Sequence, residues 1–346
     1  MPVSRGDTHP SGIVGSDALE GALTIDGACR REKGRFAPSP SGRMHIGNLY
    51  SFLVAWLVAK STGASLVLRI EDLDEARCKQ SWADAIMRDF EWLGLTWDEG
   101  PIYQHDRLDA YREAFERLRR AGRTYPCFCT RAAWHAASAP HAGEGFVYPG
   151  TCRLLPDDVR VRRTSEAHRP FAQRFYVGEG AFSYDDAFQG LQTFDMQRDV
   201  GDAVVMRSDQ AFAYQLAVVV DDADEGITQV VRGSDLIRSV PVQAALQDAL
   251  AYARPTYFHA PLLVDATGRR LSKRSGDVGM DALKERFKSP ERLWGAIAAA
   301  TGLLDGRSPD SSAPVFAVSL EELACVWNEK SCCRPSATIG SELLGL

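Results

Sequence analysis

The chain has 346 residues, of which 45% are hydrophobic and 25% are charged, and it carries a formal net charge of −6. This composition suits a globular protein of about two domains. No apolar run approaches the roughly 18 uncharged residues of a membrane span, and the negative charge argues against general affinity for nucleic acid. Residues 1–33 are rich in Gly, Ser, Asp and Ala without a signal-peptide pattern, so we predict a flexible N-terminal extension on a cytoplasmic protein.

The first organised pattern is a strand, a polar turn and a helix. Residues 34–37 indicate a short strand, which Pro38 ends because proline cannot donate to a sheet ladder, and the apolar run 49–59 indicates a buried helix. The first turn of a helix suits phosphate, since its N–H groups are unpaired and its dipole end is positive. His45 can add a donor there, and Gly47 lets a flat ligand approach the backbone. An ordinary strand–helix turn is the alternative.

A second buried strand is predicted over residues 64–71, with charged residues at its carboxyl end. This end of a parallel strand is where α/β sheets place their ligands. We expect Glu71 to lie beside the site at the first helix. We expect Asp74 instead to cap the following amphipathic helix, residues 81–93.

Three of the eight cysteines, at positions 127, 129 and 152, lie close together in the sequence. Without an export signal we expect reduced thiols, so the cluster favours metal over disulfide. The set suits one structural Zn²⁺, which would hold an insert too small to fold on its own core. His135 and His141 are candidates for the fourth ligand, and three buried cysteines without metal are the alternative. Residues 107–174 carry thirteen Arg against seven Asp or Glu, which suits either phosphate contacts or a solvated helix face.

The remaining elements are predicted from periodicity and turn residues. Residues 97–104 form a connection, residues 153–174 a loop and residues 175–195 short strands. Residues 106–123 form a helix whose apolar side is Tyr111, Ala114, Phe115 and Leu118. Residues 216–220 form a strand or a buried helix turn, 221–226 a turn, 227–232 a strand, 259–264 a strand and 268–276 a mobile basic loop. A helix capped by Ser234 or Asp235 follows Gly233, and further helices span 281–287, 290–302 and 320–327.

Five stretches resemble class I aminoacyl-tRNA synthetases, and within them the glutamyl branch. RFAPSPSGRMHIGN, residues 35–48, is similar to the HIGH signature with its preceding strand, with Asn48 in place of the last His. RIEDLD resembles the strand whose Glu contacts the amino acid, and YQLAVVVDD and VVRGSDL resemble stretches in which a Tyr and an Arg bind glutamate. GRRLSKRSG resembles the KMSKS signature, with Lys273 as its second Lys and Arg270 in place of the first Lys.

The resemblance implies roles for individual residues. The catalytic group would be His45, Asn48 and Lys273, and ATP, with Mg²⁺, would be bound by His45, Gly47 and Lys273. Glutamate would be held by Arg35, Phe36, Ala37, Pro38, Ser39, Glu71, Tyr214 and Arg232. The zinc ligands would be Cys127, Cys129, Tyr148 and Cys152. Two arginines and one carboxylate complement the charges of glutamate and argue against glutamine, whose amide would leave an arginine unpaired.

The resemblance also implies an α/β fold, with a Rossmann-type parallel sheet split by a zinc-containing insert and followed by a short helical C-terminal region. We divide the chain into the extension 1–33, the halves 34–105 and 186–265 of the catalytic domain, the insert 106–185, and the signature loop with the helical region, 266–346. Only 73 residues follow Lys273, so we expect no anticodon-binding domain.

These features most resemble the truncated glutamyl-tRNA synthetase paralogues, the glutamyl-queuosine tRNA(Asp) synthetases. The resemblance implies a monomer that uses ATP to activate L-glutamate and transfers it to the queuosine base of tRNA(Asp). A short synthetase charging a tRNA 3′ end, a small-molecule glutamate ligase and a non-enzymatic RNA-binding relic are the alternatives.

Overall fold

The computed structural model describes residues 31–130, 147–265, 267–268, 279–304 and 317–339. Residues 1–30 of the predicted extension, and also His135, His141 and Lys273, lie outside these residues. The extension was predicted to reach residue 33, but Lys33 already belongs to the first strand. Residues Met1–Arg31 form a unit separate from Glu32–Leu346, and the description below concerns the second unit. Within the part described, no helix has the length and apolar character needed to cross a membrane.

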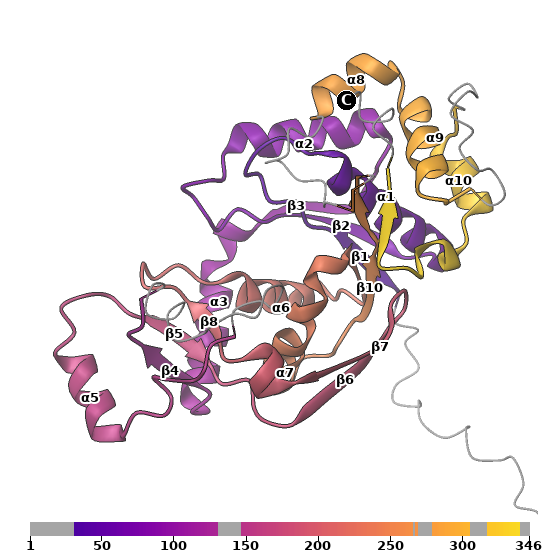
Figure 1. Cartoon of the computed structure of the whole chain (residues 1–346). Coiled ribbons are helices and arrows are strands. Elements are labelled where there is room, and N and C mark those ends of the chain that lie inside the picture. The colour runs from indigo at the N-terminus through magenta and orange to yellow at the C-terminus, as the bar shows by residue number, and fades with distance from the viewer. Residues whose placement is uncertain (1–30, 131–146, 266, 269–278, 305–316, 340–346) are drawn as a thin grey trace, which may run out of the picture. The chain divides into compact units, whose positions relative to one another are not determined.

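A parallel sheet carries the predicted ligand site. Strands β1 (Lys33–Phe36), β2 (Ser65–Ile70) and β3 (Glu99–Tyr103) pair in the order β1-β2-β3, all parallel (Figure 1). β2 confirms the strand predicted over 64–71, since its apolar run is buried. The connection predicted over 97–104 is wrong, because residues 99–103 form strand β3. Its Gly100 and Pro101 argued against a strand, but β3 lies at the end of this strand order, where a missing N–H donor is tolerated.

Further parallel strands continue beside β1. β9 (Gln229–Gly233) pairs with β10 (Thr256–Ala260), and β11 (Leu262–Val264) with β12 (Ser336–Thr338). Thr228 N donates to the carbonyl oxygen of Lys33 at 2.9 Å, which joins the start of β9 to β1. The strand predicted over 259–264 is therefore divided at Pro261 into the end of β10 and the whole of β11.

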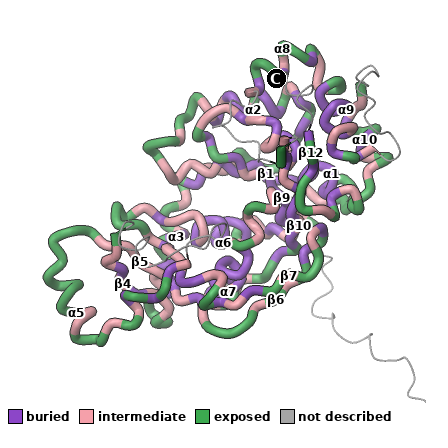
Figure 2. The backbone as a smooth tube through the Cα atoms, viewed as in Figure 1, coloured by how far each residue is buried: buried purple, intermediate pink, exposed green. Residues whose placement is uncertain are grey.

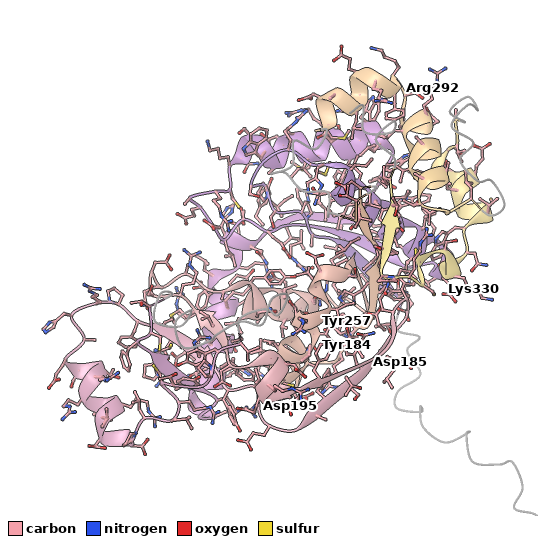
Figure 3. The ribbon with its side chains drawn as sticks, in the orientation of Figure 1. Tyr184, Asp185, Asp195, Tyr257, Arg292 and Lys330 are labelled. Carbon is pink, nitrogen blue, oxygen red and sulfur yellow. The ribbon has the colours of Figure 1, made fainter. Side chains whose placement is uncertain are left out.

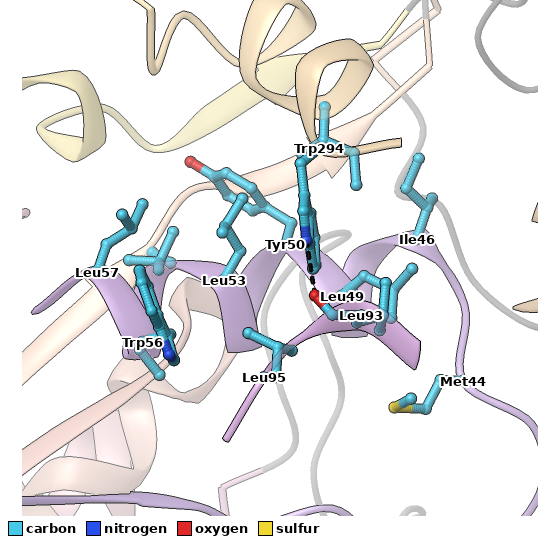
Figure 4. Close-up of a cluster of buried hydrophobic side chains, with 14 of the residues drawn as sticks. Met44, Ile46, Leu49, Tyr50, Leu53, Trp56, Leu57, Leu93, Leu95 and Trp294 are labelled. Carbon is cyan, nitrogen blue, oxygen red and sulfur yellow. Dashed lines mark hydrogen bonds between the residues drawn. The ribbon is translucent and has the colours of Figure 1, made fainter. Parts of the chain in front are cut away.

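Helices on this sheet enclose the larger hydrophobic core. α1 (Ile46–Thr62) is buried over most of its length, and α2 (Gln80–Leu93) ends at Gly94 as predicted, with φ of 74°. Figure 2 shows buried residues along α1. Trp294 of α9 (Pro290–Ala300) packs among them and donates its Nε1–H to the carbonyl oxygen of Leu93 at 3.0 Å (Figure 4). The two other C-terminal helices are α8 (Met280–Phe287) and α10 (Leu320–Val326).

A second group of elements follows β3. The short helix η1 (Gln104–Arg107) leads into α3 (Leu108–Arg120), which buries the four residues predicted for its apolar side. β4 (Thr124–Cys127), β5 (Ala172–Phe175) and β8 (Ala203–Met206) form an antiparallel sheet, and β6 (Ala181–Asp186) and β7 (Gly190–Asp195) form a hairpin. α5 (Asp157–Ser165) corrects the loop predicted over 153–174. It buries no residue, so it has no apolar periodicity to reveal it.

The next helices correct two further predictions. Residues 214–224 form α6 (Tyr214–Asp224), which includes most of the predicted turn 221–226 and resolves 216–220 as helix. The short helix η3 (Ser234–Ser239) precedes α7 (Val240–Leu250), so Ser234 and Asp235 lie inside the helical segment rather than capping it. The remaining short helices are η2 (Met196–Val200) and η5 (Glu329–Cys332).

Asp74 is not the cap of α2. The N-cap residue is Lys79, and it makes no side-chain capping bond. Asp74 instead holds the turn before the helix, where its backbone carbonyl accepts from Arg77 and Cys78 and its carboxylate accepts from Arg77 Nε at 2.7 Å. The prediction failed because residues 75–79 separate Asp74 from the start of α2.

Candidate functional site

A cavity of about 540 Å³ lies where β1, β2 and β9 end and α1 begins. Its lining includes nearly all the described residues that the sequence predicts for amino-acid and nucleotide binding: Arg35, Ala37, Pro38, Ser39, His45, Gly47, Asn48, Glu71, Tyr214 and Arg232. Phe36 is the exception among the residues predicted for amino-acid and nucleotide binding. Its ring is fully buried in the core, 5.7 Å from the ring of Phe52 and 5.2 Å from that of Phe90.

A larger cavity, of about 1220 Å³, lies elsewhere, beside the cysteine cluster. Its charged lining is mixed, with Arg163, Arg169, Arg174, Arg207 and Arg238 set against Asp74, Asp199, Asp202 and Asp209. The smaller cavity is the better candidate for small-molecule chemistry, because buried charged groups from several elements converge on it.

The mouth of α1 is organised by two residues. His45 is the N-cap, and its Nδ1 accepts the backbone N–H of Gly47 at 3.1 Å. A neutral His45 ring therefore carries its proton on Nε2. Asn48 returns the interaction, since its Oδ1 accepts the backbone N–H of His45 at 3.2 Å. The departure from the HIGH signature at this position thus has a structural role, the reciprocal cap of α1.

A network of buried charged side chains includes two residues that line the cavity, Arg35 and Glu71. The Arg69 side chain is completely buried, and its guanidinium lies 2.8 Å from Asp222, 2.7 Å from Glu225 and 3.5 Å from Glu71. Asp222 is also 3.5 Å from Nε of Arg35. Sequence reasoning missed this network. Its signal is the presence of charged residues inside otherwise apolar runs, LVLRI for Arg69 and AVVVDD for Asp222.

The network sets the protonation of the acidic groups. Burial raises the pKa of Glu71, and the nearby guanidinium groups of Arg69 and Arg35 oppose that rise. Burial likewise raises the pKa of Glu225 to about 7. A cationic ligand group beside Glu71 would favour its ionised form.

Arg232 lines the cavity, and one of its donors has no partner among the described residues. Its Nε donates to Nε2 of His259 at 3.0 Å, and its Nη2 donates to the carbonyl oxygen of Leu236 at 3.4 Å. Nη1 is buried and has no hydrogen-bond partner among the described residues. Arg35 donates from Nη1 to the carbonyl oxygen of Val231 at 3.0 Å, which brings the second guanidinium to the same strand. Two arginines and Glu71 together suit a ligand with more than one carboxylate and an ammonium group.

The described chain resumes beside this site after the second signature. Lys273 lies outside the described residues, which resume at Gly279. Gly279 forms an isolated antiparallel bridge with His45. The chain therefore returns to the mouth of α1 directly after the signature segment.

The predicted metal ligands come together in the structure. Sγ atoms of Cys127, Cys129 and Cys152 lie within 4.8 Å of one another. The Tyr148 hydroxyl is 3.5 Å from Sγ of Cys127 and 3.8 Å from Sγ of Cys129. Hydrogen bonding with Cys152, Tyr148 and Arg174 lowers the pKa of the Cys127 thiol below its usual range. Three thiols at this spacing could hold a metal ion.

Comparison with known proteins places these features in a family. A profile for tRNA synthetases class I (E and Q), catalytic domain, matches residues 33–299. The chain belongs to the class I tRNA synthetases (E and Q). Within this synthetase family, a protein named glutamyl-Q tRNA(Asp) synthetase from Nitratidesulfovibrio vulgaris is 43% identical over 282 residues, which are 79% of this chain and 87% of that protein.

Two other members are also similar. A glutamate–tRNA ligase from Geobacter sulfurreducens is 41% identical over 262 residues, 75% of this chain and 54% of the ligase. The crystal structure of glutamate-tRNA synthetase from Elizabethkingia anophelis shares the fold, with a TM-score of 0.75 at 23% identity over 91% of this chain and 69% of that one. The sequence-based assignment to class I synthetases is confirmed.

Proposed function

We propose that the protein activates L-glutamate with ATP and transfers the glutamyl group to the queuosine base in the anticodon loop of tRNA(Asp). The single observation that carries the choice of acceptor is the 43% identity, over most of both chains, to a relative named glutamyl-Q tRNA(Asp) synthetase. The cavity supports the choice of amino acid. It joins Arg35, Arg232 and Glu71, a charge set complementary to the two carboxylates and one ammonium of glutamate.

In this proposal the amino acid is held by side chains from β1, β9 and α6 and from the segments that follow β1 and β2. The unpartnered Nη1 of Arg232 donates to the side-chain carboxylate, which a neutral glutamine amide would satisfy less well. Glu71 accepts from the ammonium group. Arg35, Ser39 and Tyr214 complete the contacts, and Ala37 and Pro38 shape the wall of the cavity. Phe36 supports this wall from the core.

Adenylate formation follows from the placement of the helix mouth. An oxygen of the glutamate α-carboxylate attacks the α-phosphorus of ATP, and the bond to the bridging oxygen breaks to release pyrophosphate. His45 Nε2–H, the N–H groups near Gly47 and the Lys273 ammonium stabilise the charge that develops on the phosphates. Asn48 keeps His45 in position through the cap. Mg²⁺ enters as part of the nucleotide substrate.

Transfer then uses the mixed anhydride. A hydroxyl oxygen of the queuosine base attacks the glutamyl carbonyl carbon, the bond to the phosphate oxygen breaks, and AMP leaves as the ester forms. The hydroxyl proton passes to solvent. Positioning of the acceptor beside the anhydride supplies much of the rate in this proposal.

We also propose one structural zinc ion per chain, bound by Cys127, Cys129, Tyr148 and Cys152, in a cytoplasmic monomer. Zinc would tie the β4 end to residues 148–152 and so stabilise the elements around it. The phenol binds best as phenolate, which the ion itself favours by attracting the negative charge.

The amino-acid half of the proposal is tested by exchange of labelled pyrophosphate into ATP. We expect exchange with glutamate and not with glutamine. R232L should reduce glutamate-dependent exchange by roughly 30-fold or more, because it removes one partner of a buried charge pair. R254L is the matched control, since Arg254 is a partly exposed residue paired with Asp248. Absence of glutamate-dependent exchange in the unaltered protein, or near-normal exchange in R232L, would contradict this half of the proposal.

A further inference from the structure

Two buried residues outside the predicted site lie directly behind Arg232. His259 is in β10 and Asp186 ends β6, and both side chains are completely buried. His259 Nδ1 is 2.5 Å from Oδ2 of Asp186, and its Nε2 is 3.0 Å from Nε of Arg232. The three side chains therefore form a continuous row that begins in the β6–β7 hairpin and ends in the cavity.

The donors and acceptors of the three side chains fix the direction of each hydrogen bond in this row. Arginine has only donors, so Nε2 of His259 must be the acceptor, and the imidazole proton must lie on Nδ1, facing Asp186. Asp186 is fixed as an acceptor by three backbone N–H groups, those of His259, Phe188 and Gln189, which all donate to its Oδ1 at 3.0–3.1 Å. The carboxylate thus selects the tautomer of the ring, and the tautomer provides the acceptor for Arg232.

Besides the bond to His259, an aromatic ring and one backbone carbonyl restrain the Arg232 guanidinium. The guanidinium carbon lies 5.4 Å from the centroid of the Tyr257 ring, and that ring is nearly parallel to His259, at an interplanar angle of 17°. Figure 3 shows Tyr257 beside Tyr184 at this junction of β10 and β6. Packing on an aromatic ring restrains the plane of a guanidinium more than its rotation in that plane. The Nε bond to His259 and the long Nη2 bond to Leu236 restrain that rotation.

We propose that Asp186 and His259 are positioning residues for the amino-acid site, which hold Arg232 so that Nη1 faces the glutamate carboxylate. This inference rests on the proposed function, because it assigns the ligand of Nη1. The competing interpretation is purely structural, with Asp186 and His259 joining the β6–β7 hairpin to β10. In the positioning interpretation, loss of the acceptor at Nε2 weakens glutamate binding. In the structural interpretation it does not.

Two near-isosteric variants separate these interpretations. In H259N the amide nitrogen takes the place of Nδ1 and keeps the bond to Asp186, but no atom replaces Nε2. In H259Q the longer amide places its oxygen near Nε2, where it accepts from Arg232. We expect H259N to raise the KM for glutamate in pyrophosphate exchange by roughly 10-fold or more, since a hydrogen bond to a charged group is lost. The KM for ATP should stay unchanged, and H259Q should remain within about 3-fold of the unaltered protein.

D186N tests the tautomer from the other end of the row. The amide introduced by D186N keeps an oxygen for the backbone N–H groups but presents an N–H to Nδ1, which moves the imidazole proton to Nε2 and against Arg232. We expect D186N to raise the KM for glutamate at least as much as H259N. Nitrogen-15 NMR of His259 should report the proton on Nδ1 in the unaltered protein and on Nε2 in D186N.

The outcomes separate this inference from the proposed function. Equal KM values for glutamate in H259N and H259Q, an unchanged KM in D186N, or a proton on Nε2 in the unaltered protein would each overturn the positioning role while leaving glutamate activation intact. Absence of glutamate-dependent exchange in the unaltered protein would overturn the proposed function, and the glutamate role of Arg232 with it. H259N and H259Q should unfold at similar temperatures, which verifies that the difference in KM for glutamate does not come from a difference in stability.

Discussion

Replacing Arg69 by methionine should destabilise the fold strongly. Methionine matches the length of the side chain but leaves Asp222, Glu225 and Glu71 without the cation that lies within 3.5 Å of each carboxylate. Breaking a buried ion pair by removing one partner costs about 3–5 kcal/mol. At roughly 2–4 °C per kcal/mol for a protein of this size or somewhat smaller, the melting temperature should fall on the order of 10 °C. The melting temperatures of R69M and the unaltered protein are compared by thermal unfolding monitored with circular dichroism.

The loss in R69M should also grow with pH. Burial raises the folded-state pKa of Glu71 and takes that of Glu225 to about 7, so both groups bind protons more readily in the folded state than in the unfolded state. Ionisation of such groups therefore destabilises the fold as pH rises from the unfolded pKa through the folded pKa. Without Arg69 both folded pKa values rise further. The deficit of R69M relative to the unaltered protein should thus be larger at pH 8 than at pH 5.

R77M is the matched control for this prediction. Arg77 makes an ion pair with Asp74, but its side chain is 75% exposed. An exposed pair of this kind contributes about 0–1 kcal/mol, so the melting temperature of R77M should be close to that of the unaltered protein. A melting temperature for R69M equal to that of R77M at pH 8 would refute the reasoning that Arg69 holds the carboxylates beneath the cavity.

Two further predictions concern the metal cluster and the helix cap. Metal analysis should find one zinc per chain in the unaltered protein and none in C152A. Removal of the metal by a chelator should lower the melting temperature of the unaltered protein but not that of C152A. A fully folded protein purified without metal would contradict the zinc proposal. N48A should lose the acceptor for the His45 backbone N–H and cost about 0.5–2 kcal/mol in unfolding free energy. It should also slow pyrophosphate exchange, and a stable N48A with unchanged exchange would show that the cap does not organise the site.

Local sequence signals were sufficient for the elements that are continuous and apolar. β2 and α1 are long buried runs, and α3 shows its buried side through regular spacing. The cavity residues were also located from the sequence, although through resemblance to known signatures rather than through chemistry alone. Their convergence follows from the parallel pairing of β1 with β2 and of β9 with β10, which brings these strand ends together.

Other features depend on contacts between distant parts of the chain. Asp186 and His259 are separated by 73 positions, and Arg69 and Asp222 by 153, so no local pattern connects them. α5 has no buried face and β3 contains a glycine and a proline, so neither shows the periodicity that predicts helices and strands. The turn predicted over 221–226 failed for a related reason. Acidic residues usually indicate a solvent-exposed turn, but Asp221 and Asp222 are buried against arginines.

The acceptor is the central claim, and one measurement tests it most directly. Labelled glutamate and ATP are supplied with two tRNA pools, one from cells that make queuosine and one from cells that cannot, and the labelled tRNA is then cut by a ribonuclease. Our account predicts label only in the queuosine pool and only in the anticodon fragment. Equal label in both pools, located in the 3′-terminal fragment, would contradict it and indicate a glutamate–tRNA ligase of the ordinary kind.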